Sequence, residues 1–212
     1  MVLTPSTMLP LGTPLPAFRL PRVAGLAAPA GPDPATATTP GGPDTNAGEP
    51  LDSHDLAGRP LLVLFLCAHC PFVKHIEAEI GRLERDYGDR LQIVAIASNS
   101  TLTHPQDGPE GLRQQAERQG WRFPYLFDLD QSAARAFRAA CTPDPFLFDA
   151  GQRLVYRGQM DASRPGHGLA CDGRDLRAAL DALLAGEPVN PEQQPAIGCN
   201  IKWHPGQAPS WG

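Results

Sequence analysis

The order of apolar and polar residues predicts alternating strands and helices in the central part of the chain. Residues 61–66 form an unbroken apolar run, which is typical of a central strand covered on both faces. In residues 71–87, the apolar side chains recur three or four positions apart, as on one face of a helix. Residues 91–97 are again mostly apolar. A strand, a helix and a strand at this spacing predict a right-handed crossover with parallel strands.

The following residues continue the pattern with shorter elements. The predicted elements are a polar helix ending near residue 119, a short strand at 123–127, a short helix at 131–139, two strands at 146–149 and 153–158, and a helix at 174–185. The two strands flank Ala150-Gly151, which predicts an antiparallel hairpin. We therefore expect an α/β fold with a central mixed sheet flanked by helices.

Composition divides the chain into four parts. Residues 24–50 are almost entirely Ala, Pro, Gly and Thr, so they cannot bury enough apolar surface to offset the entropy of ordering, and we expect a flexible insert. Residues 1–23 are then an N-terminal strand or extension, residues 51–188 the domain, and residues 189–212 a C-terminal tail that packs on it.

Charge and hydropathy exclude several function classes. The 212 residues carry a formal net charge of −5, so there is no basic footprint for nucleic acid. No apolar run has the length of a membrane span. The first ten residues lack a basic segment followed by an apolar one, so we predict no secretory signal and a cytoplasmic protein. In that compartment lasting structural disulfides are rare.

The main chemical signal is the motif Cys67-Ala68-His69-Cys70, at the junction of the first buried strand and its helix. A helix N-terminus presents free N–H groups and a partial positive charge, which lower the pKa of a nearby thiol. A CxxC motif in this context is typical of thiol redox sites. A structural zinc site needs a second Cys/His pair, whereas Cys141, Cys171 and Cys199 are single and scattered. We therefore expect a redox pair and no metal site.

Six segments together resemble a known family. They are residues 4–12, 67–75, 140–144, 154–158, 173–177 and 197–203. With them, the chain resembles the peroxiredoxin-like branch of the alkyl hydroperoxide reductase/thiol-specific antioxidant (AhpC/TSA) group, in the thioredoxin-like superfamily. The resemblance implies a thioredoxin-like fold and a redox-active domain.

The resemblance also implies roles for individual residues. Cys67 matches the attacking thiolate, and Cys70 matches the resolving thiol. Pro143 matches the cis-proline that faces the CxxC motif. It would present the backbone of Thr142 to an extended substrate segment by strand addition, and we expect Ala68 to contact the substrate as well.

Other polar and sulfur-bearing residues are candidates for tuning the pair. A partly protonated His69 beside the Cys67 thiolate would stabilise the reduced form. Cys141, two residues before the proline of the Thr-Pro pair, and Cys199, in the tail segment, are possible accessory thiols; a small packed residue and a docked tail explain them equally well.

Two enzyme activities fit the motif. A thiol–disulfide oxidoreductase needs only the vicinal cysteine pair and access to it. A peroxiredoxin-type peroxidase oxidises its cysteine to sulfenic acid and resembles a Pro-x-x-x-Thr-x-x-Cys pattern, where this chain has Pro60 but Leu64 in place of the threonine. Leucine cannot hydrogen-bond a peroxide, so thiol–disulfide exchange is favoured.

A third alternative is a copper-binding module. Cys67 and Cys70, with His69 or His75, offer ligands that suit Cu(I), although the copper chaperones of this fold resemble a Cys-x-x-x-Cys spacing. In the favoured reading, no organic cofactor is needed, because the electrons reside in the redox-active cysteine pair. The expected partners are a protein or small-molecule disulfide or dithiol substrate and a thioredoxin- or glutathione-type electron donor, with no nucleic acid and no membrane.

Overall fold

The computed structural model describes residues 3–25 and 48–211, so most of the expected insert at 24–50 lies outside the described residues. The strands are β1 (Leu3–Pro5), β2 (Arg19–Ala24), β3 (Pro50–Asp52), β4 (Leu61–Phe65), β5 (Gln92–Ala97), β6 (Tyr125–Phe127), β7 (Cys141–Thr142), β8 (Asp144–Phe148), β9 (Leu154–Tyr156) and β10 (Ile197–Asn200). The helices are α1 (Pro71–Tyr87), α2 (Pro109–Gln119), α3 (Ser132–Ala136) and α4 (Arg174–Leu184), with short 3₁₀ turns at Ser53–Leu56 and Pro105–Asp107. In the described ranges, no helix has the length and apolarity that a membrane crossing requires.

Seven strands form the central sheet, in the order β3-β2-β6-β5-β4-β8-β9. Strand β4 is parallel to β5 and antiparallel to β8, and β5 is parallel to β6. The sheet is therefore mixed, as predicted, and the β4-α1-β5 unit is the expected crossover.

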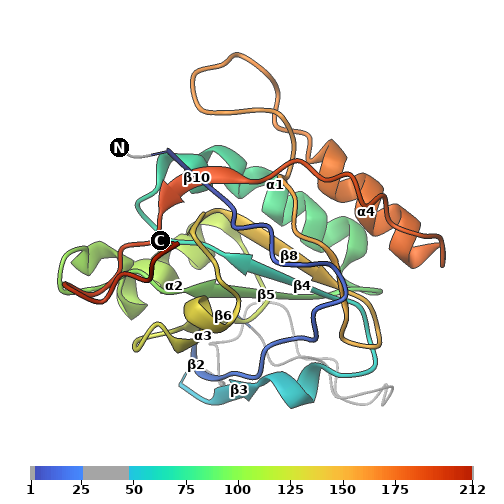
Figure 1. Cartoon of the computed structure of the whole chain (residues 1–212). Coiled ribbons are helices and arrows are strands. Elements are labelled where there is room, and N and C mark those ends of the chain that lie inside the picture. The colour runs from blue at the N-terminus through green and yellow to red at the C-terminus, as the bar shows by residue number, and fades with distance from the viewer. Residues whose placement is uncertain (1–2, 26–47, 212) are drawn as a thin grey trace.

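Helices cover both faces of this sheet (Figure 1). Alternate residues of β4 point to opposite faces, and all five are fully buried. Leu62 and Leu64 pack in a core with α1, α2 and α4. Leu61, Val63 and Phe65 pack in a second core with α3 and the N-terminal segment. The unbroken apolar run therefore reflects burial on both sides.

A second, three-stranded sheet, in the order β1-β10-β7, brings both ends of the chain to the end of β4. The tail was expected only to pack on the domain, but part of it is strand β10, which runs antiparallel to β7 (Figure 1). Beyond β10, Ile201 and Trp203 are buried in the second core. At Gly198, a Cβ atom would lie 2.1 Å from the carbonyl oxygen of Thr142. Only glycine therefore allows β10 to approach β7 so closely.

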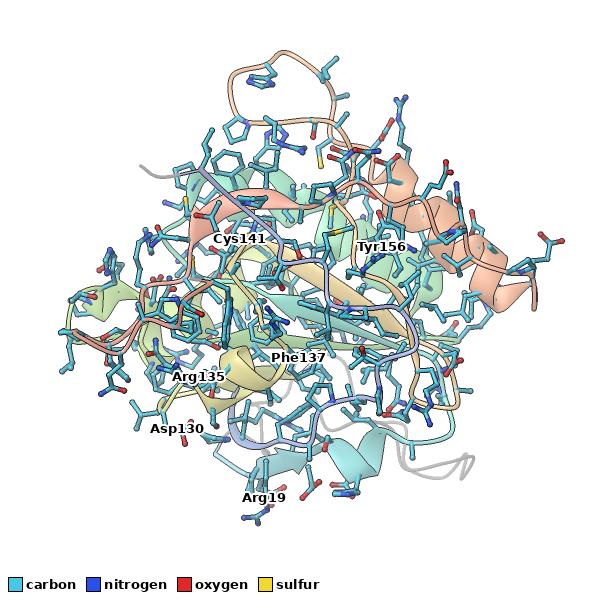
Figure 2. The ribbon with its side chains drawn as sticks, viewed as in Figure 1. Arg19, Asp130, Arg135, Phe137, Cys141 and Tyr156 are labelled. Carbon is cyan, nitrogen blue, oxygen red and sulfur yellow. The ribbon has the colours of Figure 1, made fainter. Side chains whose placement is uncertain are left out.

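Phe137 anchors the second core on the α3 side of the sheet (Figure 2). It is fully buried. Its ring meets those of Phe65, Phe146 and Phe148 at centroid distances of 5.3, 5.5 and 6.1 Å, in edge-to-face arrangements. Aromatic pairs with this geometry add to the stabilisation from burial alone.

We predict that Phe137→Ala lowers the free energy of unfolding by about 3–5 kcal/mol, because it removes this ring and leaves a cavity. Chemical denaturation measures the change. The control is Leu129→Ala, whose side chain is mostly exposed and whose loss should stay within about 0.5 kcal/mol. Equal effects of the two substitutions would contradict the packing described.

Candidate redox site

The two cysteines of the CxxC motif lie where β4 passes into α1. Pro71 occupies the first turn of α1 and Cys70 is its N-cap residue. Proline suits this position because its missing N–H would be unpaired there in any case. Both cysteines are fully buried and free, and their side chains hydrogen-bond to each other. The turn between them, Ala68 and His69, is partly exposed.

Thr142 contacts the sulfur atoms of both Cys67 and Cys70. Its hydroxyl oxygen lies 3.4 Å from the Sγ atom of Cys67. Its carbonyl oxygen lies 3.3 Å from the Sγ atom of Cys70. The Thr142–Pro143 peptide bond is cis, as the resemblance implied. The structure thus brings together Cys67, Cys70, Thr142 and Pro143, which are 76 positions apart at most in the sequence.

The expected role of Thr142 as a strand-addition platform stays a prediction, and a strand of the chain itself already pairs with this residue. Cys199 of β10 lies directly opposite Thr142 in the antiparallel register. The backbone edge that was expected to receive a substrate segment is therefore occupied by the chain's own C-terminal strand. The tail reaches it because Gly198 has no side chain to collide with Thr142.

Asp107, which the sequence analysis did not single out, fixes the CxxC turn. Its Oδ1 atom accepts hydrogen bonds from the backbone N–H groups of Ala68 and His69, at 2.9 and 3.1 Å. Its Oδ2 atom accepts one from the side-chain amide of Asn99 at 2.8 Å and lies 2.5 Å from Nδ1 of His69. Burial alone would raise the pKa of the Asp107 carboxyl, but the hydrogen bonds from His69 and Asn99 hold that pKa below its ordinary value. Asp107 is therefore a buried carboxylate.

His69 is held between Asp107 and a second imidazole. The rings of His69 and His104 stack with a centroid distance of 4.8 Å. Burial lowers the pKa of His104, and the nearby charge of His69 lowers it further. The side chain of His69 is 22% exposed, so it sits at the rim of the site. Its role in tuning the cysteine pair stays a prediction.

The pKa values of the two cysteines shift in opposite directions. The hydrogen bond from Cys67 lowers the pKa of Cys70, which also receives hydrogen bonds from Cys199 and the backbone N–H of Val73 in the first turn of α1. The same hydrogen bond to Cys70, with burial and the negative charge of Asp107, raises the pKa of Cys67. The backbone N–H of Val73 at the helix start thus reaches Cys70, and the ionisation of Cys67 stays a prediction.

The other three cysteines differ in their distance from the pair. Cys199 contacts Cys70, and burial raises the pKa of Cys199 to about 12. Cys141 is fully buried beside β10, and its Sγ atom lies 3.5 Å from the carbonyl oxygen of Pro143; Figure 2 marks its place near the start of β8. Cys171 lies in the loop before α4, next to Asp161. Of the two accessory candidates, Cys199 is therefore the one that contacts the CxxC pair.

The residues expected for the alternative functions lie as follows. Leu64 is fully buried in the core that also contains Cys67, so an apolar side chain stands where peroxidases of the resembled type have a hydroxyl. Among the described residues, the potential metal-ligand atoms of Cys67, His69 and Asp107 lie within 4.8 Å of one another. However, hydrogen bonds already occupy both oxygen atoms of Asp107. His75 instead contacts Ser163 at 2.8 Å.

Topology offers a signal that could have identified Asp107. The carboxyl ends of the parallel strands β4 and β5 meet at one edge of the sheet, where sites in open α/β folds gather. The CxxC motif follows β4, and Ser98-Asn99-Ser100 and the Asp107 loop follow β5. A carboxylate in that loop is therefore a candidate for the site. Its particular bonds to the turn depend on loop geometry that no sequence pattern specifies.

Comparison with known proteins identifies the family of this chain and structures similar to it. The profile of the AhpC/TSA family matches residues 12–157. A structure of an uncharacterized conserved protein from Geobacillus kaustophilus is 41% identical, with 97% of this chain and 98% of that chain covered and a TM-score of 0.84. A hypothetical protein from Sinorhizobium meliloti 1021 is 39% identical, with 96% and 100% covered and a TM-score of 0.82.

More distant structures share the fold. AhpC of Mycobacterium tuberculosis is 18% identical over 84% of this chain and 95% of that chain, with a TM-score of 0.54. No curated protein matches the sequence. The fold is thioredoxin-like, and the chain belongs to the AhpC/TSA family.

Proposed function

We propose that this protein is a thiol–disulfide oxidoreductase that works through Cys67 and Cys70. The observation that carries the proposal is the position of two free thiols at the start of α1, both in contact with Thr142 beside a cis-proline. Such a pair can lose two electrons by forming a disulfide without any further cofactor. The family assignment supports an oxidoreductase.

The unequal protonation supplies a base for the first step. With Cys70 as the thiolate and Cys67 as the thiol, Cys67 attacks one sulfur atom of a substrate disulfide while its proton passes to Cys70. The substrate S–S bond breaks and its other sulfur leaves as a thiolate. Cys70 then attacks Cys67, the mixed disulfide breaks, and the proton leaves with the second substrate sulfur. The substrate disulfide is reduced and the Cys67–Cys70 disulfide is formed.

Two features support Cys67 as the residue that meets the substrate. Cys67 is followed by the partly exposed turn residues Ala68 and His69. Cys70 has Cys199 and the backbone N–H of Val73 as further neighbours, so it is placed to resolve a bond formed on Cys67. A groove beside Pro143, lined by Phe72, Ile76 and other residues of mainly apolar character, offers a surface for the substrate. A thioredoxin- or glutathione-type donor would restore the dithiol, and a cytoplasmic location fits this reducing role.

Peroxide reduction is the second candidate, because the family profile includes peroxide-reducing enzymes by name. It would require a group that binds and polarises the peroxide next to the reacting sulfur. Leu64 cannot do so.

The proposed function predicts faster turnover with disulfides than with peroxides. In parallel assays with thioredoxin and thioredoxin reductase as the reducing system, we expect the protein to accelerate insulin-disulfide reduction and to consume hydroperoxide slowly. The double substitution Cys67→Ser/Cys70→Ser is the matched control and should leave only the background rates of the reducing system alone. Hydroperoxide turnover well above disulfide turnover would reverse the assignment.

The roles of the two cysteines predict an asymmetric trapping result. Cys70→Ser should accumulate a mixed disulfide with the substrate, because nothing resolves the bond on Cys67. Cys67→Ser should accumulate much less. Non-reducing gels and peptide mass spectrometry measure the products. Equal trapping by both variants, or trapping by Cys67→Ser alone, would contradict these roles.

The shared proton predicts which cysteine carries the charge. Thiolate absorbance at 240 nm in the reduced protein should rise well below the ordinary thiol pKa of about 8.5 and should disappear as pH falls through the lowered pKa of Cys70. Cys70→Ser should remove this low-pH step, whereas the control Cys171→Ser should leave it unchanged. A step that survives Cys70→Ser but is lost in Cys67→Ser would place the charge on Cys67 instead.

A further inference from the structure

Strand β10 occupies the position that an extended substrate would take at the redox site. It pairs antiparallel with β7, and Cys199 lies opposite Thr142, the residue that contacts both sulfur atoms of the CxxC pair. The tail is therefore bound by the same backbone edge that was expected to bind substrate. It also carries a thiol at that point.

The side chain of Cys199 points toward the cysteine pair. Residues directly opposite each other in an antiparallel pair have their side chains on the same face. The hydroxyl of Thr142 lies 3.4 Å from the Sγ atom of Cys67 on that face. Consistent with this placement, the side chain of Cys199 hydrogen-bonds to that of Cys70, and Cys67, Cys70 and Cys199 pack in one core.

The surroundings of Cys199 keep the strand close. The absence of a side chain at Gly198 allows the backbone of β10 to contact Thr142 and Pro143. Ile201 N–H donates to the carbonyl oxygen of Ala140 at 3.0 Å, which continues the pairing beyond β10. Lys202 N–H donates to the side chain of Asn99 at 2.8 Å. Contacts of the residues before and after Cys199 therefore keep its thiol next to Cys70.

We propose that β10 is an internal substrate of the CxxC pair and that Cys199 is a third redox-active thiol, which exchanges with the Cys67–Cys70 disulfide to form a Cys70–Cys199 disulfide. This inference rests on the proposed thiol–disulfide exchange and extends it to a segment of the chain itself. In this state, the oxidised protein stores its disulfide inside the fold and presents Cys67 as a free thiol.

The exchange balances without an added oxidant or reductant. The Cys199 thiol loses its proton, and its sulfur attacks Sγ of Cys70. The Cys67–Cys70 bond breaks, and its electron pair leaves on Cys67, which takes up the proton. Burial raises the pKa of Cys199 to about 12, and the hydrogen bond to Cys70 and the negative charge on Cys70 contribute. Those contributions are lost once Cys70 is part of a disulfide, while the positive charge of Lys202 remains and lowers that pKa.

The test uses the full-length Cys67→Ser variant, in which Cys70 has no partner within the motif. Oxidation of this variant with diamide, which converts dithiols to disulfides, should remove two titratable thiols. Peptide mass spectrometry should locate the new bond between Cys70 and Cys199. Cys67→Ser/Cys171→Ser should form the same bond, whereas Cys67→Ser/Cys199→Ser should not.

A second measurement uses the wild-type protein. After oxidation and acid quenching, peptide mapping should find both the Cys67–Cys70 and the Cys70–Cys199 disulfides. Cys70–Cys141 bonding in place of Cys70–Cys199, or no intramolecular bond to residue 199 in either protein, would overturn the proposal. Neither measurement uses an external disulfide substrate, so a failure here is distinguishable from a failure of the insulin assay.

Discussion

The contact of Thr142 with the CxxC turn is the constraint on which the site depends. The hydroxyl and carbonyl groups of this one residue meet the sulfur atoms of Cys67 and Cys70. The cis peptide bond to Pro143 places both groups at the end of β4, and β10 pairs on the same residue. Three segments that are distant in the sequence thus converge on one backbone position, and the chemistry of the thiols follows from that convergence.

The contact between the two thiols, together with burial and nearby charge, makes their pKa values differ. Asp107 is a buried carboxylate that holds the Ala68–His69 backbone through two N–H groups, so it orders the turn and also opposes ionisation of Cys67. Cys70 lies farther along the turn, where the first N–H groups of α1 stabilise an anion. The lowered pKa of Cys70 and the raised pKa of Cys67 favour the negative charge on Cys70.

Much of the fold could be predicted from the sequence, because burial on both faces leaves a clear signal in residues 61–66 and the helical spacing of 71–87 marks α1. The CxxC motif could be identified for the same reason, since its position between those two elements is local information. Strand β10 could not be predicted in this way. Its pairing with β7 depends on the small residue Gly198 and joins residues that lie 57 positions apart in the sequence, Thr142 and Cys199. The lowered pKa of Cys70 likewise depends on tertiary contacts with Cys199 and Thr142.

The most direct test of the central claim is a redox equilibrium of the wild-type protein in buffers of reduced and oxidised glutathione, quenched with acid and mapped by mass spectrometry. The account predicts a reversible two-electron transition in which residue 67 and residue 70 become bonded, with Cys141 and Cys171 still free. If Cys67 and Cys70 stay as thiols across the whole range of buffers, or if they join only to glutathione and never to a cysteine of the chain, the redox assignment of this site is contradicted.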